Sequence, residues 1–492
     1  MLESNPIALH YVSCWIVAEH RFGNGRFAIA TSQSTHDRRQ GNRLYRAQSI
    51  EFQFARGLVE RLAQAGYVAL FAGGCVRDAI LKLEPHDFDI ATSATLDQVR
   101  DVFGEKNTQA VGEAFGVVIV HGRQHGCKCK VEVATFRSDG AYSDGRRPDW
   151  VVYSSPEQDA QRRDFTINGL FYDPIAGRVI DYVEGQRDLA SKTLRAIGCA
   201  EARFREDKLR MLRGIRFAAR FDLEIDTATW DAIVAQSSTI SVVSGERIGI
   251  ELSKILEHPR RAWAWQQLLE TSLLEHVLPE ASCVENRPTV DAEDAQKLYF
   301  RSEDWASGIR MLEMLPPVAL PAETALATVL SPWYDQQVAA EASTSPHRLA
   351  SLLQAIKHRW KLPNQSIESV RFAIMNADVL LDADRLAWSR VQPLLVAPYA
   401  ESALAVAAAK SQSLQLHPRG IEYCRARISE PMERWNPKPW LDGADLIRAG
   451  LTPGPEFSKL LAMARNKQLD GTLTTRAAAL DWLAQSVADA RP

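Results

Sequence analysis

The segment YVALFAGGCVRDAILKLEPHDFDIA, residues 67–91, decides the fold of this chain. Its apolar start, Tyr67 to Ala72, predicts a β-strand, and the glycine pair that follows predicts a tight turn. The next stretch, Val76–Leu83, predicts a helix. A strand, a glycine turn and a helix in this order present backbone N–H groups to a phosphate.

The end of the same segment carries two aspartates separated by one residue. We expect a second short strand from His86 to Ala91, on which Asp87 and Asp89 point to one face because side chains alternate along a strand. Two carboxylates on one face can hold Mg²⁺ together. A glycine turn and an Asp-x-Asp are each common in proteins without such a site. Their ordered combination, however, indicates phosphoryl or nucleotidyl transfer.

The composition is that of an ordinary soluble protein with several domains. At 492 residues the chain is too long for one core, and its 46% hydrophobic and 24% charged content is typical of soluble proteins. A net charge of -3 argues against a uniformly basic nucleic-acid coat protein. A local basic channel remains open, because basic residues cluster in one short segment: Arg203, Arg205, Lys208, Arg210, Arg213, Arg216 and Arg220.

The cysteines and the chain start bear on the compartment. Seven scattered cysteines favour a reducing compartment. Cys127 and Cys129 follow Gly126 in a predicted hairpin, and no second Cys or His pair stands at zinc spacing, so this pair is interpreted as structural. No apolar run is long enough to span a bilayer, and no secretory signal is evident. The expectation is a cytoplasmic enzyme that does not associate with membranes.

The pattern of apolar residues predicts an α+β chain in five parts. Residues 1–47 are polar and aperiodic, and we expect a poorly ordered extension; residues 48–195 predict a small mixed-sheet head. Residues 196–284 predict a helical neck, residues 285–435 a helical body with no recognisable catalytic constellation, and residues 436–492 a helical tail. The neck helices are expected near 209–221, 227–236, 245–257 and 262–275.

A third informative segment is Arg162-Arg163-Asp164-Phe165-Thr166-Ile167-Asn168. Two adjacent guanidinium groups suit an anionic triphosphate, because arginine stays charged and forms bidentate bonds to phosphate. The alternative is a solvated basic cap in which Asp164 or Thr166 is the N-cap of a helix.

A fourth segment places Asp207, Arg210, Arg213 and Arg216 three residues apart. On a continuous helix all four lie along one stripe. A carboxylate and guanidinium groups in such a stripe can bind the Watson–Crick edge of a base, while the more remote arginines reach phosphates. The alternative is a helix face held by ion pairs between its own residues.

Together these segments resemble the class II tRNA nucleotidyltransferases and bacterial poly(A) polymerases of the DNA polymerase beta superfamily. The match runs from about Gly66 to Leu278 and includes Glu246-Arg247-Ile248. It implies a polymerase beta-like head and a role for each motif position. Gly74 and Arg77 contact the nucleotide phosphates, Asp87 and Asp89 bind Mg²⁺, Arg163 helps to hold the nucleotide, Asp207 and Arg210 read the base of CTP or ATP, and Arg213 and Arg216 complete the nucleotide site. Glu132 is a candidate third carboxylate, although pairing with Arg137 is an equal alternative.

Three further stretches favour a tRNA enzyme within that family. Residues 111–118 are similar to the tRNA enzymes, and residues 137–148 resemble the loop of those that add the terminal A. Residues 440–483 resemble a C-terminal module that grips tRNA. Gly169 and Lys208 depart from the residues usual there. The resemblance therefore implies template-independent addition of CCA, or part of it, to the 3′ end of tRNA. A poly(A) polymerase and an inactive RNA-binding homologue are the alternatives, and the oligomeric state is open.

Overall fold

The computed structural model describes residues 44–45, 49–85, 87–112, 116–140, 150–281 and 300–489. The predicted extension, residues 1–47, lies outside these ranges except for Leu44 and Tyr45. Tyr45 is buried, and its ring packs against Phe52, Phe71 and Phe88. This end of the predicted extension therefore belongs to the core of the head.

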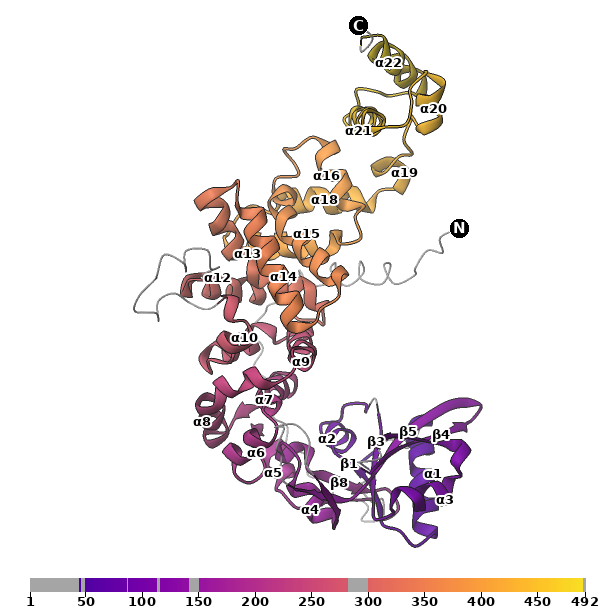
Figure 1. Ribbon diagram of the computed structural model, residues 1–492, viewed down its shortest axis with the longest axis vertical. Coiled ribbons are helices and arrows are strands. Elements are labelled where there is room, and N and C mark those ends of the chain that lie inside the picture. Colours follow the sequence, from indigo (N-terminus) through magenta and orange to yellow (C-terminus); the bar gives the residue numbers. More distant parts are fainter. Residues whose placement is uncertain are drawn as a thin grey trace, which may run out of the picture. The chain divides into compact units, whose positions relative to one another are not determined.

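The head is built on one seven-stranded mixed sheet with the order β3-β4-β5-β2-β1-β8-β9 (Figure 1). Only β2 and β5 pair in parallel, and every other neighbouring pair in this sheet is antiparallel. The predicted mixed sheet is confirmed. The strands are β1 Ala69–Ala72, β2 Asp89–Thr92, β3 Thr108–Gly112, β4 Val117–Gln124, β5 Cys127–Thr135, β8 Leu170–Asp173 and β9 Arg178–Asp181.

Two helices with side-chain caps cover one face of this sheet. Helix α1, Ile50–Gln64, begins after Ser49, whose hydroxyl accepts a hydrogen bond from the Phe52 N–H. Helix α3, Leu96–Phe103, begins with a capping box between Thr95 and Gln98. Both helices contact β4. The opposite face of the sheet carries a smaller buried apolar cluster, which includes Leu70, Ala91 and Phe171.

The deciding segment folds in the predicted order but with shifted bounds. Helix α2 spans Gly74–Ile80, so it starts directly after Gly73 and ends earlier than predicted. Strand β2 begins at Asp89, and Asp87 precedes it. The remaining elements of the head are α4 Pro156–Gln161, α5 Gly185–Ala190 and the hairpin of β6 Arg137–Asp139 with β7 Val151–Tyr153. Most of the loop between β6 and β7, to which the A-adding resemblance was assigned, lies outside the described residues, as do residues 113–115.

The rest of the described chain is helical apart from the short parallel pair of β10, Thr193–Leu194, and β11, Glu224–Ile225. The helices that follow the head are α6 Ala200–Glu206, α7 Leu209–Phe221, α8 Thr227–Gln236, α9 Gly245–Glu257, α10 Arg261–Glu270, α11 Leu273–Val277, α12 Ser302–Glu313, α13 Ala322–Glu341, α14 Ser345–Trp360, α15 Asn364–Leu381, α16 Trp388–Leu395, α17 Ala400–Ser413, α18 Arg419–Ser429, α19 Met432–Trp435, α20 Gly443–Arg448, α21 Pro455–Leu469 and α22 Arg476–Asp489. Among the described residues no single helix has the length and apolar composition of a membrane span; α16 and α17 meet that test only jointly, across a bend of 114°.

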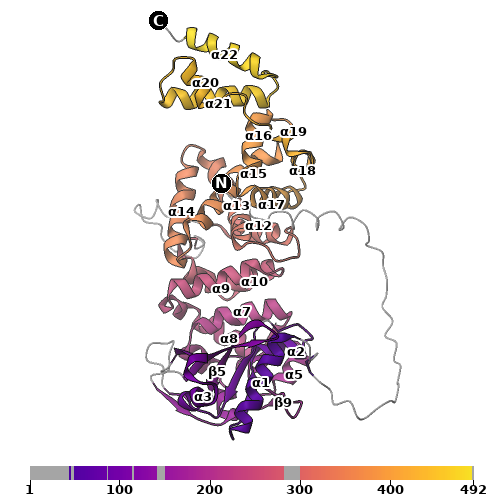
Figure 2. The same cartoon turned by 90° about the vertical axis from the view of Figure 1, so that its right-hand side faces the viewer.

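The last three helices form a unit with its own apolar core (Figure 2). Leu446, Ala464 and Leu483 are buried in that core. Asp470 connects the unit to α16, because its carboxylate accepts hydrogen bonds of 2.8 Å from both the backbone N–H and the hydroxyl of Ser389.

Helices α9 and α14 approach each other through two glycines. A Cβ atom added at Gly245 would lie 1.6 Å from the carbonyl oxygen of Arg359, and one added at Gly249 would lie 2.3 Å from that of Trp360. The Trp360 indole also donates a 2.9 Å hydrogen bond to the Val277 carbonyl. A larger residue at either glycine therefore meets backbone, which cannot turn aside as a side chain can.

Gly249→Ala is expected to lower the free energy of unfolding by about 2 kcal/mol, because overpacked contacts typically cost this much. Gly57→Ala is the control, since Gly57 lies inside α1 with nothing within 4 Å of an added Cβ. That change should stabilise the protein by about 0.5–1 kcal/mol through the better helix propensity of alanine. Thermal unfolding midpoints that move in the same direction in both variants would contradict the packing argument.

Candidate nucleotide site

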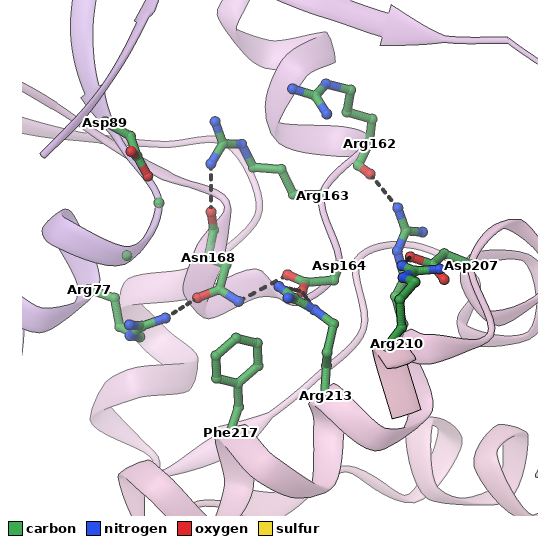
Figure 3. A pocket seen from close by; sticks show the side chains of 13 residues that line it. Arg77, Asp89, Arg162, Arg163, Asp164, Asn168, Asp207, Arg210, Arg213 and Phe217 are labelled. Atoms are coloured by element: carbon green, nitrogen blue, oxygen red, sulfur yellow. Dashed lines mark hydrogen bonds and ion pairs between the residues drawn. The ribbon is translucent and has the colours of Figure 1, made fainter. Parts of the chain in front are cut away.

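A polar cavity of about 520 Å³ brings together most of the predicted site residues (Figure 3). Seven of the nine line it: Gly74, Arg77, Asp89, Arg163, Asp207, Arg210 and Arg213. Asp87 and Arg216 do not line it. The resemblance gives no individual role to the other lining residues, although Gly73 and Arg162 belong to the predicted phosphate-binding segments: Gly73, Arg162, Asp164, Asn168, Phe217 and Arg247.

The glycine turn makes room for an arginine. Gly73 has φ 69°, a conformation that favours glycine, and a Cβ atom there would lie 2.8 Å from Nη1 of Arg163. The same Nη1 donates a 3.2 Å hydrogen bond to the Asn168 carbonyl. Gly73 is thus needed both for the turn and for the approach of the guanidinium group.

Arg77 is buried and makes several contacts with other parts of the chain. Its Nε and Nη2 donate to Oδ1 of Asp78 at 2.8 and 2.6 Å, and Nη1 donates to the Asn168 side chain. The guanidinium carbon lies 4.2 Å from the centre of the Phe221 ring on α7. Burial lowers the pKa of Arg77 below its usual value. The structure therefore shows Arg77 joining the head to α7, and its contact with phosphate stays a prediction.

The two aspartates of the Asp-x-Asp motif are exposed, while Phe88 and Ile90 are buried. This alternation places Asp89 on the face of the sheet opposite the main core of the head, and Asp87, which precedes the strand, is exposed as well. The sheet register pairs Asp89 with Glu132 of β5. Arg137, the alternative partner of Glu132, has its Nε 3.1 Å from Oδ1 of Asp139. Partial desolvation in the cavity, with the negative charges of Glu132 and Asp87, raises the pKa of Asp89 to about 6 although Arg163 opposes the shift.

These carboxylates fit a hard divalent cation. They supply oxygen donors, and the charges of Glu132 and Asp87 add to the effect of burial in raising the pKa of Asp89, a shift that a bound cation would oppose. Among the described residues no group of three or more His, Cys, Asp or Glu side chains is arranged to hold a metal. The structural case for a metal therefore rests on the Asp87 and Asp89 pair.

A buried aspartate that the sequence interpretation missed holds both adjacent arginines. Asp159 is 1% exposed and accepts hydrogen bonds from Nε and Nη2 of Arg162 at 2.9 and 2.7 Å, and from the same atoms of Arg163 at 3.2 and 2.9 Å. Burial would raise the pKa of Asp159, but the charges and hydrogen bonds of Arg163 and Arg162 outweigh it and lower the pKa. The signal was present in the sequence, because Asp159 precedes the arginines by three and four residues, the spacing of helical neighbours.

Asp164 links the head to α7. Its Oδ2 accepts hydrogen bonds from Nε and Nη2 of Arg213 at 2.9 and 2.7 Å, and its Oδ1 accepts one of 2.9 Å from Asn168. The alternative in which Asp164 or Thr166 caps a helix is wrong, because the turn that follows, Thr166–Asn168, has Phe165 at its N-cap position and no side-chain cap. Burial would raise the pKa of Asp164, but Arg213 and Asn168 hold it well below its usual range.

The predicted continuous stripe is wrong at both ends. Asp207 lies in the break between α6 and α7 with extended backbone, φ −139°, and Nη2 of Arg247 donates to its Oδ2 at 2.8 Å. Arg216 is buried, and its Nε lies 2.5 Å from Oε2 of Glu251 on α9. The Asp207 carboxylate is consequently held by a residue of α9 instead of by the periodicity of α7.

Arg210 and Arg213 remain on the cavity side of α7 (Figure 3). Arg210 donates to Oε2 of Glu206 at 2.6 Å and to the carbonyl of Arg162 at 3.1 Å. The Phe217 ring lies under the guanidinium groups of Arg213 and Arg216, at 5.1 and 4.2 Å. The cavity thus has the Asp89 carboxylate at one end, the Asp207 carboxylate with Arg210 and Arg247 at the other, and arginines between them.

Comparison with known proteins identifies the family. Residues 69–195 match the poly(A) polymerase head domain, and residues 222–284 match a domain described as a probable RNA- and SrmB-binding site of polymerase A. A curated CCA-adding enzyme of Lactiplantibacillus plantarum is 32% identical over 450 residues, which is 90% of this chain and 98% of the relative. The chain belongs to the CCA-adding enzyme family.

Solved members of the family share the fold. The CCA-adding enzyme of Bacillus stearothermophilus in complex with CTP superposes with a TM-score of 0.67 at 26% identity, over 90% of this chain and 99% of that one. The Thermotoga maritima CCA-adding enzyme complexed with tRNA has a TM-score of 0.60 at 21% identity, over 89% of this chain and 95% of that one. The polymerase beta-like head followed by helices is therefore confirmed.

Asp164→Asn is expected to lower the free energy of unfolding at pH 7 by about 3 kcal/mol, because it leaves Arg213 without its carboxylate partner. The native pKa of Asp164 is depressed, so the stability from its charge is present above the unfolded pKa near 4 and is lost as the pH falls through the native value. The difference in the free energy of unfolding between the native protein and the variant, measured by urea unfolding, should therefore shrink below about pH 4. Asp231→Asn, an exposed control on α8, should change stability by less than about 0.5 kcal/mol. A loss of unfolding free energy in Asp164→Asn that does not depend on pH would contradict the ion-pair argument.

Proposed function

We propose that this protein adds CCA, or part of it, to the 3′ end of tRNA, using CTP and ATP and without a nucleic-acid template. The proposal rests on one observation: the same cavity is lined by Asp89 and Arg163 of the head and, opposite them, by Asp207 and Arg210. A nucleoside triphosphate has its phosphates at one end and its base at the other. The two ends of the cavity carry the chemistry that each of those groups requires.

The phosphate end would be built by three groups. Gly73 and Gly74 supply the turn, and Arg163, fixed by Asp159, points a guanidinium group toward Asp89 (Figure 3). Because its position is set before the nucleotide arrives, Arg163 would bind phosphate without a further loss of side-chain entropy. Arg213 is held near the middle of the cavity by Asp164 and would meet the sugar or the phosphates.

The base end would read an exocyclic amine beside a ring nitrogen, which cytosine and adenine share. The Asp207 carboxylate accepts a hydrogen bond from such an amine, and Arg210 donates one to the ring nitrogen. Arg247 sets the orientation of Asp207 and Glu206 that of Arg210. Selection by fixed side chains requires no template strand.

The cofactor in this proposal is Mg²⁺, held by Asp87 and Asp89. When bound, it would lower the pKa of the RNA 3′-hydroxyl and stabilise the pyrophosphate that leaves. The residues of the chain would align the hydroxyl with the α-phosphate and hold the triphosphate, and the reaction needs no covalent enzyme intermediate.

Two parts of the proposal concern the partner and the compartment. The α20–α22 unit, within the predicted tail of residues 436–492, would bind tRNA by contacts to phosphate and shape. The cysteines of the described residues are all free, which fits a reducing compartment, and we place the reaction in the cytoplasm.

The reaction is tested with a tRNA that lacks its CCA end, supplied with ATP alone and with ATP plus CTP. We expect a product that requires CTP and stops after the missing nucleotides, and no incorporation by the Asp87→Asn, Asp89→Asn double variant, which should still bind the tRNA. A long A tail made from ATP alone would establish the poly(A) polymerase alternative. Equal incorporation by the double variant would overturn the metal assignment, and tRNA binding without pyrophosphate release by the native protein would establish the inactive homologue.

Asp207→Asn is expected to reduce discrimination against UTP and GTP by about tenfold or more, because the amide group can donate where the carboxylate only accepts. The readout is kcat/KM for each of the four nucleotides with the same tRNA. The control is Glu224→Gln, an exposed change on β11 that should leave all four values in place. An equal loss for all four nucleotides would show that Asp207 supports the fold and does not read the base.

A further inference from the structure

The hairpin of β4 and β5 carries a strip of four basic side chains: His121, Arg123, Lys128 and Lys130. We propose that this hairpin strip binds backbone phosphates of the RNA substrate and leads the strand toward the carboxylates. The inference rests on the proposed function, because it concerns the RNA on which the cavity would act.

The hairpin strip lies on the same face of the sheet as the Asp-x-Asp carboxylates. Asp89 is in register with Glu132 of β5, and Lys130 and Lys128 follow Glu132 at two-residue steps, so their side chains share its face. The antiparallel register then places His121 opposite Lys130 and Arg123 opposite Lys128. With about 3.4 Å per residue, Lys130 stands about 7 Å and Lys128 about 14 Å along the strand from Glu132.

The opposite face of the hairpin is fixed by packing, so the strip cannot turn inward. Val120 and Val131 are buried in the head core, and the Phe54 ring of α1 packs directly on Gly122. At the tip, Nε2 of His125 lies 2.9 Å from Oε1 of Gln53 on α1. The strip is therefore a rigid surface whose side chains point into solvent.

The positive charges of Arg123, Lys128 and Lys130 are not neutralised within the described residues. All four side chains are exposed. Within those ranges, His121 lies 3.2 Å from the Gln109 side chain and Arg123 donates to the Gly126 carbonyl, and no carboxylate forms an ion pair with any of the four. By contrast, Arg162 and Arg163 in the cavity both have a carboxylate partner in Asp159.

The arrangement within the strip opposes the stability of the hairpin. Arg123 and Lys128 are directly opposite each other across two antiparallel strands, and like charges in that position repel. An anion bound across the pair removes the repulsion, which makes the strip a better match for a polyanion than for water.

The extended form of the strip favours an RNA backbone over a free nucleotide. A nucleoside triphosphate already has arginines in the cavity, whereas Lys128 stands about 14 Å beyond Glu132. Successive phosphates of a polynucleotide, by contrast, can meet successive basic side chains along a strand. The contacts would carry no sequence information, as suits an enzyme that accepts many tRNAs.

Lys128→Glu in the full-length protein tests the strip, with Arg178→Glu as the matched control, because Arg178 is an exposed arginine on β9 at the far edge of the same sheet. The Kd for a tRNA lacking CCA is measured by fluorescence anisotropy in EDTA at several salt concentrations, and the KM for CTP and the thermal midpoint are measured beside it. Lys128→Glu should weaken RNA binding severalfold and reduce the slope of log Kd against log salt by about 1. Arg178→Glu should leave both at the native values.

The thermal midpoint separates binding from folding. In Lys128→Glu the new carboxylate would face Arg123, so this variant should keep or raise the midpoint while it weakens RNA binding, with the KM for CTP unchanged. Three results would each overturn the proposal. They are a native Kd and salt slope in Lys128→Glu, equal effects of Lys128→Glu and Arg178→Glu on RNA binding, and a change in Lys128→Glu that is confined to a raised KM for CTP. Because the anisotropy measurement requires no turnover, an inactive native protein that still binds RNA through the strip would defeat the proposed function and leave this inference standing.

Discussion

The ion pair between Asp164 and Arg213 is the interaction on which the nucleotide cavity depends. It joins the segment after α4 to α7, so one contact sets the distance between the arginines of the head and those of the helical part. The same carboxylate accepts a hydrogen bond from Asn168, and Asn168 accepts one from Arg77. A series of polar contacts thus runs from α7 to the glycine turn. We therefore expect a change at Asp164 to disturb the structure at both of these places.

The basic side chains of the cavity and those of the β4–β5 hairpin have different surroundings. In the cavity, arginines are held by buried or half-buried carboxylates: Arg163 by Asp159, Arg213 by Asp164, and Arg210 by Glu206. These partners fix geometry and leave outer guanidinium N–H groups for a ligand. On the β4–β5 hairpin, basic groups have no such partners in the described residues. The first arrangement suits a small ligand in one pose, and the second suits a long polyanion in many.

Much of this was predictable from the sequence, because the relevant signals are local. The strand, glycine turn and Asp-x-Asp gave the head, and apolar periodicity gave α7, α8 and α9 with their observed bounds. Two failures in the site share one cause: Asp207 and Arg216 were placed by assuming that i, i+3 spacing continues. The helix begins only after Asp207, and Glu251, distant in sequence, draws Arg216 away from the cavity. Contacts between residues far apart in the chain, such as Asp164 with Arg213, leave no periodic signal.

The break before α7 bears on the proposed choice of nucleotide. Because Asp207 has extended backbone and is oriented by Arg247, the proposed contact with the base depends on two separate segments of the chain. Arg247 lies on α9 between Gly245 and Gly249, the two residues whose backbones press against α14. Transplanting the 206–216 segment into a relative would therefore move Asp207 and leave behind Arg247, which orients it. Under the role proposed for Asp207, a transfer of nucleotide specificity would need residues from both the α6–α7 break and α9.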